Sequence, residues 1–133
     1  MRDPAIWYNS ASKKYFVFST GSGIQIFTST SLLGPWTNVG SVLPNCTVIP
    51  ISVPTNCGLW APDINYVNGQ YVLYYSASSL GSQNSAIGVA TSPSMEPGTW
   101  TDHGAVVTSA TGDEYNASES PSLACTPQVP SEL

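Results

Sequence analysis

Leu59-Trp60-Ala61-Pro62-Asp63-Ile64 precedes the run 71–76, Tyr-Val-Leu-Tyr-Tyr-Ser, whose aromatic and aliphatic residues are typical of a buried β-strand. Proline fixes its own φ and biases the preceding residue away from helix, so we expect Ala61 to be extended and Asp63 to be held at a strand end. Trp60 offers a flat apolar face and an N–H donor beside that carboxylate, which suits the faces and hydroxyl edges of a sugar. A buried tryptophan next to a turn aspartate explains the same residues equally well.

A pattern of short strands occurs twice along the chain. The first unit has strand-like segments at 5–8, 15–19 and 24–29, a turn at 21–23 and a closing segment at 34–40; the second has 63–66, 70–76, 85–92 and 98–104. Trp36 and Trp100 occupy equivalent places, 64 residues apart. Short strands with Trp and Gly at fixed places are typical of β-propeller blades. We therefore predict an all-β chain with about two blades in residues 1–117, and a Ser/Pro-rich, disordered tail over 118–133.

The composition excludes several classes of partner. Only 8% of the 133 residues are charged, against about 25% in a typical soluble domain. The chain has three Lys and Arg residues and eight Asp and Glu residues, so no excess of basic residues favours binding to nucleic acid or to an anionic membrane. No apolar run approaches the roughly 20 residues that span a bilayer. A neutral partner such as an uncharged polysaccharide fits these numbers.

The cysteines and glycosylation sequons point outside the cell. Cys46 and Cys57 flank a loop rich in Pro, Thr and Val, where a disulfide would restrain the insertion, although two free buried thiols are the alternative. Sequons occur at Asn45 and Asn116, and they matter only in a secreted protein. No signal peptide is visible. We expect an extracellular protein whose N-terminal part is missing here.

Several motifs in order resemble those of glycoside hydrolase family 43, and most closely those of its endo-1,5-α-L-arabinanases. They are Asp3-Pro4-Ala5-Ile6, the segment 15–21, Leu59 to Ile64, the segment 71–76 and Ser85-Ala86-Ile87-Gly88. The resemblance runs from about Asp3 to Ala117. It implies a five-bladed β-propeller, an inverting mechanism, and a cleft across the central axis that accepts arabinan or arabino-oligosaccharide. A monomer is expected.

The resemblance also implies a catalytic role for Asp3. An inverting glycosidase needs one carboxylic acid to protonate the leaving oxygen and one carboxylate to activate water on the opposite sugar face, about 6.5–9.5 Å away. The family's general base matches Asp3, although the histidine that usually precedes this Asp-Pro is Arg2 here. Without the neighbouring motifs, a lone Asp-Pro is better explained as the start of a turn.

Further positions match the substrate side of the family's cleft. Trp60 matches a residue that lines it, and Asp63 matches an acidic residue for which hydroxyl binding is implied, with a structural role as the alternative. In the loop 78–85 the family commonly has Phe where this chain has Leu80, so the wall stays apolar but loses a ring face. The predicted substrate-binding residues are Trp60, Asp63, Ser79, Leu80 and Asn84.

Other positions depart from the family. After Asn116-Ala117 the family continues Ile-Asp-Pro, whose aspartate modulates the acid; here Glu119 is an uncertain stand-in. The general acid belongs to a later blade, so we expect a chain that is incomplete at both ends and inactive by itself. We expect no cofactor or metal ligand in this chain, whereas a central cation such as calcium is implied for full-length relatives. His103 is expected in a turn, with a structural role.

Three alternatives remain open. Within the family, β-xylosidase or α-L-arabinofuranosidase activity uses the same blade motifs, while the Ser-rich loop around Leu80 favours an endo-arabinanase. A non-catalytic carbohydrate-binding fragment would keep Trp60 without needing Asp3. An extracellular β-domain with no role in sugar binding would need neither residue.

Overall fold

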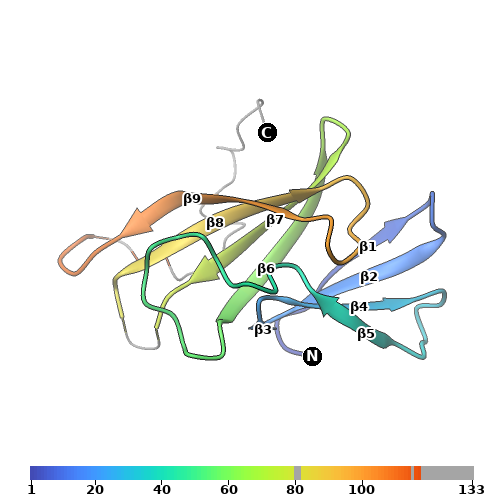
Figure 1. Ribbon diagram of the computed structural model, residues 1–133, viewed down its shortest axis with the longest axis horizontal. Coiled ribbons are helices and arrows are strands. Elements are labelled where there is room, and N and C mark those ends of the chain that lie inside the picture. The colour runs from blue at the N-terminus through green and yellow to red at the C-terminus, as the bar shows by residue number, and fades with distance from the viewer. Residues whose placement is uncertain (80–81, 115, 118–133) are drawn as a thin grey trace.

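The computed structural model describes residues 1–79, 82–114 and 116–117 (Figure 1). Every regular element in these ranges is a β-strand, which confirms the all-β prediction. The predicted tail, 118–133, lies outside the described residues. In the described part of the chain, no helix is long and apolar enough to cross a membrane.

The strands form two antiparallel sheets that correspond to the two predicted blades. The first sheet has the order β1-β2-β4-β5, and its strands are β1 (Ala5–Asn9), β2 (Lys14–Ser19), β4 (Gln25–Ser29) and β5 (Thr37–Ser41). The second has the order β3-β6-β7-β8-β9, and its strands are β3 (Gly21–Ser22), β6 (Gly58–Val67), β7 (Gln70–Ala77), β8 (Ser85–Ser92) and β9 (Thr101–Ser109).

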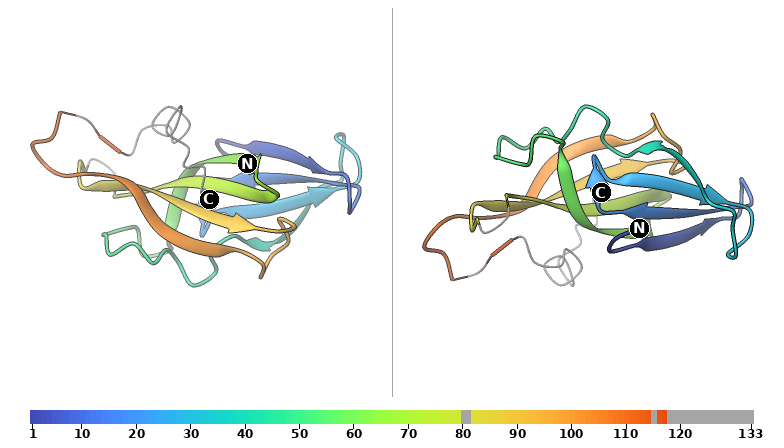
Figure 2. Two further views of the ribbon diagram at one scale, coloured as in Figure 1. Left: turned by 90° about the horizontal axis from the view of Figure 1, so that it is seen from above. Right: turned by 90° about the horizontal axis from the view of Figure 1, so that it is seen from below.

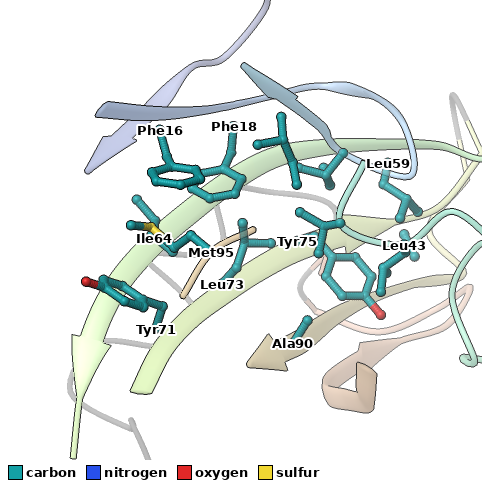
Figure 3. Close-up of a cluster of buried hydrophobic side chains, with 14 of the residues drawn as sticks. Phe16, Phe18, Leu43, Leu59, Ile64, Tyr71, Leu73, Tyr75, Ala90 and Met95 are labelled. Atoms are coloured by element: carbon teal, nitrogen blue, oxygen red, sulfur yellow. The ribbon is translucent and has the colours of Figure 1, made fainter. Parts of the chain in front are cut away.

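Strand alternation explains how the sheets meet. In β2, Phe16 and Phe18 point into a core shared with the second sheet, where Leu73 and Tyr75 of β7 meet them (Figure 3). Both phenylalanines are fully buried, and burying such a side chain stabilises the fold by about 1.5–3 kcal/mol. Trp100 packs edge-on against Phe18, with 5.6 Å between ring centroids. The two sheets therefore lie together as neighbouring layers (Figure 2).

The connection between β6 and β7 follows the prediction. Asn68 and Gly69 both have positive φ, 50° and 79°, as the two-residue turn favoured by Asn-Gly requires. The predicted turn at 21–23 is wrong in part. Gly21 and Ser22 form β3, which pairs with Leu59 and Gly58 of β6 and so joins the first blade to the second sheet. That pairing is between distant segments, and local turn chemistry does not reveal it.

The opening motif folds differently from the prediction. Trp60 pairs with Ser76 and Asp63 pairs with Tyr74, so Ala61 and Pro62 together occupy one position of the ladder as a β-bulge. Ala61 has a φ of 53°, so the expectation that it is extended is wrong. A bulge is one of the few places in a sheet that tolerates proline, which lacks the N–H for the ladder.

Two further placements differ from the expectations. β6 begins at Gly58 rather than at residue 63, so Asp63 lies inside the strand instead of at its end. His103 lies in β9 rather than in a turn. Its Nε2 forms a 2.7 Å hydrogen bond with Thr91 Oγ1 on the neighbouring strand, which is a structural contact.

The loop 42–57 crosses the second sheet and is fixed to it. Of the two alternatives for Cys46 and Cys57, the structure shows the disulfide, with a Cα–Cα distance of 5.6 Å. Closing a loop of this length removes unfolded-state entropy worth about 3 kcal/mol. The backbone N–H of Val48 and the hydroxyl of Thr47 donate to Asp102 Oδ2 at 2.9 and 3.1 Å. The loop is thus held in place on β9 before it reaches the site described below.

Candidate active site

A cavity of about 700 Å³ lies where β1 and β6 begin. It brings together Asp3, Trp60 and Ser79, three of the predicted site residues, from segments far apart in the sequence. The fixed loop 42–57 contributes Pro54 and Asn56 to the same wall. Both sheets and the disulfide-closed loop therefore shape one cavity.

Asp3 is held at this cavity by the end of the neighbouring strand. Its φ is 49°, a region that non-glycine residues enter rarely and that is often found at functional sites. Arg2 fixes the backbone just before it, because its N–H donates to Ser19 Oγ at 2.9 Å and its carbonyl accepts the N–H of Thr20 at 2.9 Å. The chain therefore reaches Asp3 along a defined path.

Thr20 connects the Asp3 carboxylate to the bulge of the second sheet. Its hydroxyl donates to Asp3 Oδ2 at 2.7 Å and accepts the backbone N–H of Ala61 at 2.9 Å. Because the hydroxyl has only one proton, the amide of Ala61 fixes its direction, and the proton points at the carboxylate. The bulge in β6 thus orients the side chain of the residue that follows β2.

The chemistry of the cavity follows from these neighbours. Asp3 is exposed, so its carboxylate is open to water and can accept a proton from it as a general base. Trp60 is half-buried on the same cavity and presents an apolar surface, and Arg2, which also lines it, carries five N–H donors. A base, an apolar wall and donors are what a neutral sugar with an attacking water requires.

Ser79 ties the substrate-side loop to the loop 42–57. Its hydroxyl donates to the carbonyl of Ser52 at 3.2 Å. Ser78, one residue earlier, is buried and shares a 2.6 Å hydrogen bond with Ser85 Oγ. These contacts place the start of the segment at the edge of the cavity.

Asp63 and Asn84 do not line the cavity. The Asp63 carboxylate accepts a 3.0 Å hydrogen bond from Asn65 Nδ2 further along β6. Asn84 Oδ1 accepts the N–H of Thr111 at 3.0 Å, which is a contact between loops. Leu80 and Glu119 lie outside the described residues.

Thr20 and Asn56 are among the lining residues that were missed as site residues. A signal for Thr20 exists in the sequence. Asp3 precedes β1, Thr20 follows β2, and hairpin pairing brings these two strand ends together. Asn56 lies in the insertion between the blades, where no periodic pattern places a residue.

The central cation implied for full-length relatives does not fit these residues alone. Across residues 1–79, 82–114 and 116–117, no group of three or more His, Cys, Asp or Glu side chains can hold a metal ion. His103 is engaged with Thr91 on the second sheet. No chemical step is therefore assigned to a cation here.

Comparison with known proteins identifies relatives of this arrangement. The sequence pattern of the glycosyl hydrolases of family 43 matches residues 1–118. A probable arabinan endo-1,5-α-L-arabinosidase C of Neosartorya fischeri is 53% identical over 116 residues, which are 86% of this chain and 36% of that protein. The chain thus spans about a third of the length of the curated relatives it matches.

Solved structures of arabinanases are also similar to this chain over part of their length. An endo-arabinanase of Bacillus licheniformis is 38% identical with a TM-score of 0.73, over 88% of this chain and 41% of that one. The arabinanase of Cellvibrio cellulosa, solved with arabinohexaose, is 31% identical with a TM-score of 0.71, over 87% of this chain and 38% of that one. The two sheets therefore match blades of the five-bladed propeller of these arabinanases.

Proposed function

Because the chain belongs to glycosyl hydrolase family 43, we propose that it supplies the general base and one cleft wall of an inverting enzyme that hydrolyses α-1,5-L-arabinofuranosidic bonds in arabinan. The observation that carries this proposal is the cavity in which Thr20 holds Asp3 on the side that Trp60 also lines. The arabinanases among the relatives support the choice of arabinan over a xylan-type substrate.

The proposed reaction gives each residue a simple task. Asp3 takes a proton from a water molecule, whose oxygen then attacks the anomeric carbon on the face opposite the leaving group. Trp60 packs against the apolar face of a sugar ring and excludes bulk water. Asp3 is the one carboxylate among the described residues that line the cavity, so the proton donor to the leaving oxygen is assigned to a later blade.

Two experiments test this assignment. In the first, residues 3–117 replace the matching segment of a full-length endo-arabinanase, and hydrolysis of linear arabinan is measured with and without D3N. Loss of a general base lowers turnover by about 10²–10⁴-fold, while binding of arabinohexaose is retained. Glu96→Gln, which removes a carboxylate paired with Lys14 instead, is the matched control and keeps turnover.

The second experiment uses the 133-residue chain alone. Without a general acid, we expect no release of arabino-oligosaccharides from linear arabinan. Clear release would contradict this division of labour. Full turnover by the D3N chimera would remove Asp3 from the mechanism, and retained binding without any turnover in the unmodified chimera would favour a carbohydrate-binding role.

We also propose that the protein acts outside the cell as a monomer. The Cys46–Cys57 disulfide supports an oxidising compartment. The low content of charged residues and the neutral substrate agree with this setting.

A further inference from the structure

A second cavity lies at the opposite ends of β1 and β6. It has a volume of about 600 Å³ and is bounded by the turn after β1, the far end of β6 and the residues that follow β8. Asp3 precedes β1 and Asn9 ends it, so a strand rise of about 3.3 Å per residue separates the two cavities by about 20 Å. The second cavity therefore takes no part in the chemistry assigned to Asp3.

The walls of this far cavity are aromatic. Trp7 and Tyr8 of β1, Tyr66 of β6 and Tyr71 of β7 all line it. Tyr66 and Tyr71 are cross-strand partners with ring centroids 4.7 Å apart. The ring of Tyr8 packs against Tyr15 with 4.7 Å between centroids, whereas Tyr66 is 51% exposed and so leaves ring surface available. Such surfaces pack well against the C–H faces of sugar rings.

The wall is built before any ligand arrives. Asn9 is 5% exposed, and its Nδ2 donates to the carbonyl of Ser94 at 3.0 Å. Its Oδ1 accepts the N–H groups of Ala11 and Ser12 at 2.9 and 3.3 Å. One buried amide thus joins the turn after β1 to the segment after β8, and a preformed site loses little entropy on binding.

The polar groups of the far cavity are neutral. Its lining includes no Asp, Glu, Lys, Arg or His among the described residues. Within the described part of the chain, the hydroxyls of Ser10 and Ser12 form no protein hydrogen bond and are available to a ligand. Burial, followed by the proximity of Tyr66, raises the pKa of the Tyr71 hydroxyl, which therefore stays protonated as a donor.

We propose that the far cavity is a second saccharide-binding site, which takes a neutral oligosaccharide and performs no chemistry. Exposed rings beside neutral hydroxyls fit the alternating apolar faces and hydroxyl edges of a sugar. The absence of charge from the described lining disfavours phosphorylated or acidic ligands, because nothing there compensates their desolvation. The choice of arabinohexaose as first probe rests on the proposed function; the site itself does not.

The test follows backbone amide NMR signals of the 133-residue chain during titration with arabinohexaose and, separately, xylohexaose. Shifts at Ser10, Ser12 and Tyr66 with either sugar support the far site. No shift at these residues with both sugars overturns it. This measurement uses the unmodified protein, so it does not depend on a variant that folds. Failure of the D3N experiment would leave it unchanged.

Variants then separate the two cavities. Tyr66→Ala removes a half-exposed ring and is expected to weaken binding at the far site about fivefold, while Trp60→Ala leaves the shifts at Ser10 and Ser12 intact. Leu33→Ala, at a residue that is 97% exposed and lines neither cavity, is the control. Loss of the far-site shifts in Trp60→Ala, or unchanged affinity in Tyr66→Ala, would overturn the proposal.

Discussion

Replacing Thr20 with valine tests the link between the bulge and the proposed base. Valine keeps the shape of threonine but removes the hydroxyl that donates to Asp3 and accepts from Ala61. The bond to Asp3 is exposed, so water replaces it at little cost. The amide of Ala61 is half-buried, and leaving such a donor unpaired costs about 1 kcal/mol, the lower end of the range for buried groups.

This loss is measurable by urea unfolding of the chain. With a denaturant slope of about 1.5 kcal/mol per molar, a loss of about 1 kcal/mol lowers the midpoint by about 0.7 M. Thr20→Ser keeps the hydroxyl and is expected to recover most of the stability. In the chimeric enzyme, Thr20→Val also frees the Asp3 carboxylate, and a displacement of about 1 Å lowers turnover by up to about 100-fold.

The Thr20→Ser variant separates the contribution of the hydroxyl from that of the methyl group. Thr20→Ser lacks only the methyl and Thr20→Val lacks only the hydroxyl, so equal urea midpoints would mean that the methyl contributes as much to stability as the hydroxyl, contrary to the expectation. If Thr20→Val matches the unmodified chain in both midpoint and turnover, the hydrogen-bonded connection from Ala61 to Asp3 contributes nothing, and the proposed orientation of the base is wrong.

Two further predictions concern the core of the second sheet. A Cβ at Gly88 would lie 2.3 Å from Tyr75 Cζ, so Gly88→Ala is expected to destabilise the chain by about 3 kcal/mol in urea unfolding. The control is Gly69→Ala, whose Cβ meets nothing within 4 Å at a φ of 79° and which should cost about 1 kcal/mol. Equal losses of stability in the two variants would refute the steric explanation. Burial, with a smaller contribution from Asp102, raises the pKa of Tyr75 well above 10. The folded chain thus keeps this proton when the unfolded chain has lost it, and the resulting stabilisation is complete below pH 10 and declines as pH rises further. Tyr75→Phe should show a smaller decline between pH 9 and 11, and an unchanged slope would contradict the assignment.

The strands of the first blade could be predicted because their signal is local. Alternating side chains act over a few residues, and β1 and β2 begin and end within one residue of the prediction. The Asn68-Gly69 turn of the second sheet is local in the same way. β3 could not be predicted in this way. Gly21 and Ser22 become a strand only because Leu59 and Gly58 lie beside them, and a contact across that sequence distance leaves no trace in local periodicity.

In the site, too, some residues could be predicted from the sequence and others could not. The motifs that resemble the family predicted Asp3 and Trp60 as site residues, and both line one cavity. Asp63 was placed wrongly at a strand end because β6 begins five residues earlier, at Gly58. Leu59 and Ile64 are both in the core although their offset along the strand is an odd number of positions, which would put them on opposite faces of a regular strand. Only the bulge between them restores the alternation.

That bulge separates the requirements of the fold from those of the site. With Ala61 removed and Pro62 replaced by a residue that has an N–H, Trp60 and Asp63 would still pair with their partners on β7 in an uninterrupted ladder, and the core faces of β6 would be unchanged. The residue that the bulge adds is the one whose amide reaches Thr20. A designer who shortens β6 to an ideal strand would therefore obtain a well-formed blade in which Thr20, no longer oriented by the amide of Ala61, does not hold the proposed base Asp3.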